Sequence, residues 1–101
     1  MVAKNEAKAS SSGKKVLKKA PFSLMAPDAQ NVQLAGDFNS WNPEVTPLKK
    51  STKGVWKINL NLSPGRYEYR FLVDGTWHND PQCSARVANP FGEENCLLII
   101  D

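Results

Sequence analysis

The sequence has few of the side chains that catalytic and metal sites require. It contains one histidine, His78, and two cysteines, Cys83 and Cys96. A structural zinc site uses four ligands, and these three residues do not supply them. One histidine that is far in sequence from any activated serine gives weak support for a catalytic triad. We therefore expect no metal, no cofactor and no enzymatic activity.

Long hydrophobic runs are also missing. No stretch of the sequence approaches the roughly 18 consecutive apolar residues of a membrane span. The lysine-rich start is not followed by the apolar region of a signal peptide. We therefore expect a cytoplasmic protein that does not enter a membrane. The two cysteines allow one disulfide by count, but a cytosolic setting favours free thiols.

Most of the chain carries no excess of basic residues. Residues 1–20 contain six lysines and one glutamate, a net charge of +5, whereas residues 21–101 contain seven bases and nine acids, a net charge of −2. This mildly acidic part argues against a nucleic-acid-binding face, so we do not expect nucleic acid as a partner of the domain. The tail itself leaves a different hypothesis open, which is salt-dependent binding to nucleic acid or to an acidic surface.

The composition of residues 1–20 predicts a disordered tail, because lysine, alanine, serine and glycine bury too little surface to offset chain entropy. The character changes at Phe22, and no helical periodicity is sustained beyond it. Short alternating segments separated by turn signals predict instead a β-sandwich or barrel of about six to eight strands over residues 21–101. A chain of 101 residues is enough for one such domain.

Four segments of this part are predicted strands, and residues 28–31 are predicted to make a turn into a further segment, residues 32–35. Residues 22–25 form a short first strand that stops near a proline, and residues 96–100 form a last strand that we expect to be covered on both sides. Residues 55–62 and 66–73 alternate between apolar and polar side chains. The second of these ends at Asp74-Gly75, which predicts a type I′ hairpin turn.

Two of the three tryptophans lie outside the alternating patterns. Trp41 follows a turn-rich run and Trp77 follows the hairpin signal, whereas Trp56 shares a face with aliphatic residues and is predicted to be in the core. Arg70 alternates out of phase with the apolar face of its strand, so it should point to solvent. Because Arg70 and Trp77 lie on the two arms of one hairpin, they could share its outer face. Exposed indoles on polar loops are costly unless a flat, partly apolar ligand docks on them.

An indole next to a guanidinium suits a sugar ring, which offers C–H groups for stacking and hydroxyls for hydrogen bonds. A proline-rich peptide could stack there too. The alternative without a ligand is that Trp41 covers the edge of the sandwich and Trp77 packs against a loop. A glycosidase pair chosen from Asp37, Asp74 and Asp80 would need two carboxyls in a cleft, for which a domain of this size has little room.

Three segments together resemble the glycogen-binding module of the AMP-activated protein kinase β subunit and of the N-terminus of branching and debranching enzymes. The resemblance rests on residues 32–41, 65–81 and 92–95, and it spans about residues 21–101. It implies an immunoglobulin-like β-sandwich that binds α-1,4-linked glucans without cleaving them. It also implies an α-glucan polysaccharide or oligosaccharide as the partner, and a separate glucan-metabolising enzyme or kinase as a further one. We expect the module to stand alone behind the basic tail.

The resemblance assigns a carbohydrate-binding role to six positions. Two aromatic residues match the stacking platforms, two polar residues match groups that bond glucose hydroxyls, one residue matches a leucine that threads into the curve of the glucan, and one replaces a threonine that bonds sugar. In this order they are Trp41 and Trp77, Arg70 and Asn95, Phe91, and Glu93. Because Glu93 lacks the hydroxyl donor, the alternative is a protein-interaction or regulatory module of the same fold with a weakened glucan site.

Overall fold

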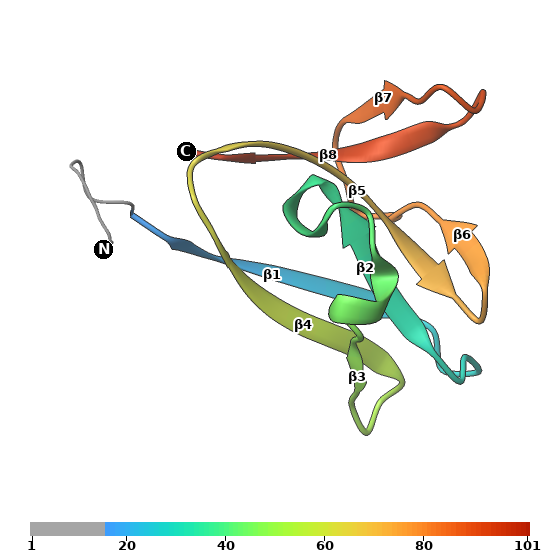
Figure 1. Cartoon of the computed structure of the whole chain (residues 1–101). Helices are drawn as coiled ribbons and strands as arrows, with labels where there is room; N and C mark the ends of the chain where they lie inside the picture. The colour runs from blue at the N-terminus through green and yellow to red at the C-terminus, as the bar shows by residue number, and fades with distance from the viewer. Residues whose placement is uncertain (1–15) are drawn as a thin grey trace.

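The computed structural model describes residues 16–101, which form two antiparallel sheets (Figure 1). One sheet has the strand order β1-β4-β3, and the other has the order β2-β5-β8-β7 with β6 also paired to β5. The strands are β1 (Lys18–Met25), β2 (Val32–Gly36), β3 (Lys49–Lys50), β4 (Val55–Leu62), β5 (Gly65–Val73), β6 (Thr76–His78), β7 (Arg86–Ala88) and β8 (Glu94–Ile100). The predicted immunoglobulin-like β-sandwich is confirmed. No helix in residues 16–101 is long and apolar enough to cross a membrane.

The two alternating segments of the sequence become the long strands β4 and β5. The inner face of β4 carries Trp56 and Leu62, both buried, and that of β5 carries Tyr69 and Phe71, also buried. Only two residues separate β4 from β5, yet the strands belong to different sheets, so the chain crosses from one layer to the other at this turn (Figure 1). The apolar faces of both strands therefore meet in one core, as their alternation predicts.

Strand β5 is the centre of the larger sheet. It pairs with β2 along one edge, and with β8 and β6 along the other. Its inward side chains meet the opposite sheet, where the ring centroids of Tyr69 and Phe22 lie 5.1 Å apart in an edge-to-face arrangement. The outward side chains of β5 alternate with these and lie on the outer face of the sheet. This outer face is where the functional site is found.

The first strand begins earlier than the sequence predicts. Strand β1 starts at Lys18, inside the segment assigned to the tail, and pairs with β4 over its whole length. Ala20 is buried against the core although its neighbours on both sides are exposed. Tertiary pairing with β4 supplies what the local composition lacks. The rest of the predicted tail, residues 1–15, lies outside the described residues.

The last strand is covered on both sides only at its start, where Asn95 and Cys96 are buried, so the prediction of a strand covered on both sides is wrong for the rest of β8. In β8 the side chains of Cys96, Leu98 and Ile100 pack toward the core, whereas Ile99 on the other face is 56% exposed. Side chains of β8 alternate between the two faces as in any strand. The alternation is not visible in the sequence because both faces carry apolar residues, although only one face meets the opposite sheet.

The two cysteines form a disulfide, so the prediction of free thiols is also wrong. Cys96 lies on β8 and Cys83 lies in the loop between β6 and β7. The fold brings their Cα atoms to 5.9 Å, a normal separation for a disulfide. A cytosolic compartment favours thiols, but the sequence carries no sign that the fold brings these two cysteines together.

Candidate functional site

An open groove of about 670 Å³ lies on the outer face of the larger sheet. All six residues that the resemblance singles out line it, together with four others. The lining residues are Asp37, Trp41, Glu68, Arg70, Trp77, Asn89, Pro90, Phe91, Glu93 and Asn95. The floor is formed by β5 and β8, and the walls are formed by the loops that follow β2 and β7 and by strand β6.

The hairpin β5–β6 places Trp77 over the floor of the groove. Its turn residues Asp74 and Gly75 have φ values of 48° and 83°, both positive as a type I′ turn requires. Trp77 pairs with Leu72, which lies on the same strand face as Arg70. The prediction that Arg70 and Trp77 share one outer face is therefore confirmed. Trp77 is 41% exposed, so one part of its indole remains open to the groove.

A tightly held loop carries Trp41. Asn39 organises this loop, because its side chain accepts from the Gly36 N–H and donates to the Leu34 carbonyl, at 3.1 and 3.0 Å. Gly36 lies so close to β5 that a Cβ there would come within 2.6 Å of the Glu68 carbonyl oxygen. The start of the loop therefore packs directly against the sheet. Trp41 follows in a left-handed backbone conformation with φ of 59°.

Asp37 fixes the ring of Trp41 relative to the sheet. Its Oδ1 accepts from the indole Nε1–H of Trp41 at 3.0 Å, and its Oδ2 accepts from the backbone N–H of Glu68 at 2.8 Å. One carboxylate therefore connects the loop, the indole and strand β5. A charge-assisted hydrogen bond is stronger than a neutral one, so this bridge sets the direction of the ring.

We expect Asp37→Ala to lower the free energy of unfolding by about 1–2 kcal/mol, because two hydrogen bonds are lost at an accessible position. The indole N–H resonance of Trp41 should shift, and its heteronuclear NOE should fall, because the ring is no longer fixed. Chemical denaturation and NMR measure both effects. Asp28→Ala is the matched control, since Asp28 is an exposed aspartate away from the groove. An unchanged Trp41 resonance would contradict the bridging role.

Trp41 and Trp77 contact one another across the groove. Their ring centroids lie 6.4 Å apart with an interplanar angle of 64°. The two rings come from segments that are distant in sequence, a loop after β2 and the edge strand β6. Trp77 does pack against a loop, the one that carries Trp41, as the alternative without a ligand expects, but both rings also line the groove.

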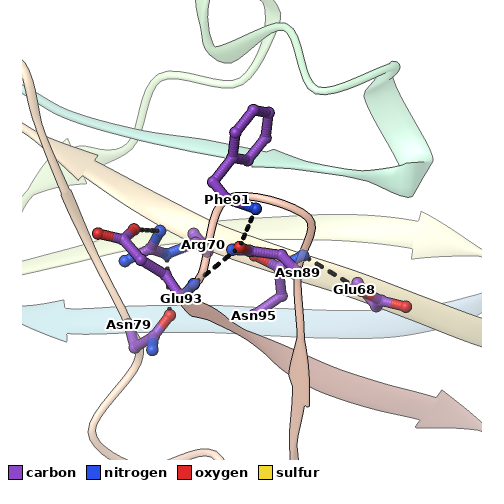
Figure 2. A network of polar contacts seen from close by, with 7 residues as sticks. All are labelled: Glu68, Arg70, Asn79, Asn89, Phe91, Glu93 and Asn95. Atoms are coloured by element: carbon purple, nitrogen blue, oxygen red, sulfur yellow. Dashed lines mark hydrogen bonds and ion pairs between the residues drawn. The ribbon is translucent and has the colours of Figure 1, made fainter.

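Arg70 does not point to solvent, so that prediction is wrong. Its side chain is 12% exposed. Its Nε donates to Asn79 Oδ1 at 3.0 Å, and its Nη1 donates to Glu93 Oε1 at 2.6 Å (Figure 2). The alternation of β5 does direct Arg70 to the outer face, but loops before β7 and before β8 cover it there. Strand periodicity predicts on which face of a sheet a side chain lies, but it does not predict which loops cover that face.

Asn95 is buried in the floor and both ends of its amide are occupied (Figure 2). Its Nδ2 donates to Glu68 Oε1, and its Oδ1 accepts from Asn89 Nδ2, each at 3.1 Å. The Oδ1 of Asn89 in turn accepts from the backbone N–H groups of Phe91 and Glu93. This network shapes the loop between β7 and β8. Phe91 at its tip is 86% exposed and points away from the network.

The three aspartates considered as a glycosidase pair are not brought together, because only Asp37 lines the groove. Asp74 accepts from the backbone N–H groups of Gln30 and Asn31 at the far side of the hairpin. Asp80 is buried and accepts from the Tyr69 hydroxyl at 2.8 Å. Burial of Tyr69 and this hydrogen bond raise the pKa of the phenol above its usual range. Asp74 and Asp80 therefore stabilise the fold through these hydrogen bonds.

Sequence reasoning missed several polar residues of the site. Glu68 lies two residues before Arg70 on the same strand face, so strand periodicity could have identified it. Asn79 and Asn89 lie in loops, where no periodicity indicates which way a side chain points. Asp37 was considered only as a catalytic acid, although a turn aspartate four residues before a tryptophan is also a candidate hydrogen-bond partner for the indole.

The β-sandwich presents two tryptophans and a network of polar side chains in one open groove, an arrangement typical of a carbohydrate-binding module. The family model of the glycogen recognition site of AMP-activated protein kinase matches residues 25–101. The chain belongs to this family, as the resemblance of the three segments predicts.

Curated relatives place the same module in larger proteins. The chain is 43% identical over 72 residues to Protein FLOURY ENDOSPERM 6, chloroplastic, from Oryza sativa subsp. japonica, which covers 71% of this chain and 13% of that protein. It is 42% identical over 69 residues to 5'-AMP-activated protein kinase subunit beta-1 from Sus scrofa, 68% of this chain and 53% of the subunit. A 1,4-alpha-glucan branching enzyme GlgB 2 of Xanthomonas campestris is 38% identical over 54 residues, 52% of this chain and 7% of the enzyme. The chain thus spans from less than a tenth to about half of these relatives.

Proposed function

We propose that the groove binds α-1,4-linked glucans, such as glycogen, starch or maltooligosaccharides, and does not cleave them. The observation that carries the proposal is the pair of tryptophans, 6.4 Å apart and tilted by 64°. Two rings in one plane fit a flat ligand. Two tilted rings fit a chain that bends between successive sugars, as an α-1,4-linked glucan does.

Polar groups on the groove provide for the sugar hydroxyls. A guanidinium has five N–H donors, and within residues 16–101 two of those of Arg70 are bonded to protein side chains. Glu93 is mostly exposed and its second carboxylate oxygen can accept from a hydroxyl. Exposed Phe91 at the rim adds an apolar surface for a sugar face. We therefore assign sugar contacts to these three residues and to both tryptophans, whereas Asn95 acts by shaping the floor.

The carboxylates that line the groove favour binding without cleavage. A glycosidase needs one protonated carboxyl and a second carboxylate, placed on either side of the scissile bond. Asp37 uses both oxygens to hold Trp41 and β5, and Glu68 accepts from Asn95 and from Arg66. Glu93 is ion-paired with Arg70. Each of the three carboxylates therefore already holds another part of the site in place, which favours a binding role for the groove over cleavage.

A titration of maltoheptaose against tryptophan fluorescence tests the proposal. We expect a saturable change in emission with a Kd on the order of 100 μM, which corresponds to about −5 to −6 kcal/mol. Cellohexaose is the control, because its β-1,4 linkage makes a flat chain that cannot contact both tilted rings. It should bind at least about tenfold more weakly, because it loses the stacking contact with one of the two rings. Unchanged emission at millimolar maltoheptaose would contradict the proposal.

The second candidate function is a regulatory or protein-interaction module with a weakened glucan site. The ion pair between Arg70 and Glu93 favours it, because it occupies part of the guanidinium. Similarity to a kinase subunit and to a branching enzyme suggests a kinase or a glucan-metabolising enzyme as the partner, in the cytoplasm expected from the sequence. Co-purification of such an enzyme with the Trp77→Ala variant, together with a failed titration, would favour this candidate.

A further inference from the structure

We infer that the groove selects uncharged α-glucans and rejects those that carry a phosphate or carboxylate. Glu93 determines this selectivity through its ion pair with Arg70. The inference rests on the proposed glucan binding and adds to it a class of accepted ligand. A sugar with an ammonium group in place of a hydroxyl is accepted as well as the neutral one, or better.

The first support is the charge of the lining. The groove has three carboxylates, Asp37, Glu68 and Glu93, against one cationic side chain, Arg70, a formal net charge of −2. Lys18 and Lys19 of β1 bring the formal net charge of residues 16–101 to zero, but neither of them lines the groove. The local charge of the groove therefore repels an anionic ligand when it is bound.

The second support is that Arg70 is already hydrogen-bonded to two protein side chains, Asn79 and Glu93. Its side chain is almost covered, and its Nη1 lies 2.6 Å from Glu93 Oε1. A phosphate that bonded this nitrogen would displace the Glu93 carboxylate and leave it beside the phosphate. A neutral hydroxyl can instead accept from another N–H of Arg70 while the ion pair stays intact. The pair thus discriminates between ligands by charge and not by shape.

The third support is that the other two carboxylates are held in place. Asp37 bonds Trp41 and the backbone of β5, and Glu68 bonds Asn95 in the floor and the exposed Arg66. Neither can rotate away from an anion without breaking these bonds. Arg66 offsets part of the charge of Glu68, but its side chain is half exposed and does not line the groove. The repulsion is therefore built into the fold of the site.

A charge series on one scaffold tests the inference. β-Cyclodextrin is compared with derivatives in which one primary hydroxyl is replaced by an ammonium group or carries a phosphate. At low salt we expect the phosphate derivative to bind roughly tenfold more weakly than the neutral ring, and the ammonium derivative at least as tightly. The difference should shrink as added salt shortens the Debye length to about 3 Å near 1 M. Isothermal titration calorimetry on the full chain measures each Kd.

Two neighbouring glutamates supply the variant and its matched control. Glu93→Gln removes the ion pair and one charge from the groove, so the phosphate penalty should fall to about threefold or less. Glu94→Gln makes the same charge change one residue away, at a position that does not line the groove, and should leave most of the penalty. Equal binding of the neutral and phosphate rings by the unaltered chain at low salt would overturn the inference. An equal effect of the two variants would overturn the role of Glu93. If the neutral ring itself fails to bind, the proposed function fails, and the inference with it.

Discussion

Trp77→Ala should weaken binding of maltoheptaose by at least about thirtyfold, equivalent to about 2 kcal/mol, while the domain stays folded. Trp77 is a stacking surface in the proposed site and also the ring that Trp41 packs against. Its removal takes away one contact with the sugar and leaves the second ring less constrained. The fold should survive because all three residues of β6 are exposed. Fluorescence titration and thermal denaturation measure the two properties separately.

Trp56 provides both controls for this result. It is buried in the core and its Nε1 donates to the Ala26 carbonyl at 2.9 Å. Trp56→Phe should keep binding and keep the sugar-dependent change in emission, which assigns that change to the groove. Trp56→Ala should instead lower stability by about 3–5 kcal/mol, the usual cost of a large cavity. Unaltered affinity in Trp77→Ala would mean that the groove is not the glucan site.

The parts of the fold that could be predicted from sequence are those with a strong local signal. The alternation in β4 and β5 gives the correct inward residues, and Asp74-Gly75 gives the correct turn. Weak elements were missed, since β3 and β7 have two and three residues and exist through pairing with longer strands. The start of β1 was also misplaced because its stability comes from β4 and not from its own composition.

The site, like the fold, has one part that the sequence predicts and one part that it does not. The resemblance and the hairpin together predict the six residues that meet at the groove, and the structure places all of them there. What sequence could not give is which polar groups are already engaged. The pairing of Arg70 with Glu93 joins residues 23 positions apart, and that of Asn95 with Glu68 joins residues 27 apart. Such contacts depend on how loops cover a sheet, and periodicity carries no information on this.

Loss of the Cys83–Cys96 disulfide is the second large expected effect. The bond closes a loop with a sequence separation of 13, so its loss should reduce the free energy of unfolding by about 3 kcal/mol. A small domain has only about 5–10 kcal/mol in total, so the reduced protein should unfold at a clearly lower denaturant concentration. Denaturation followed by circular dichroism, with and without dithiothreitol, measures this shift. A cytosolic setting would favour the reduced, less stable form.

The disulfide also borders the proposed glucan site, and the structure predicts how far its loss reaches. Cys96 follows Asn95 in β8, but Asp80, in the loop that contains Cys83, remains anchored to the hydroxyl of Tyr69. Maltoheptaose affinity should therefore fall by no more than about threefold on reduction at temperatures where the domain is folded. The double variant Cys83→Ala and Cys96→Ala should match the reduced protein and be insensitive to dithiothreitol. A denaturation midpoint that does not move on reduction would show that the bond does not restrain the unfolded chain. A large loss of affinity at unchanged secondary structure would show instead that the disulfide positions Asn95.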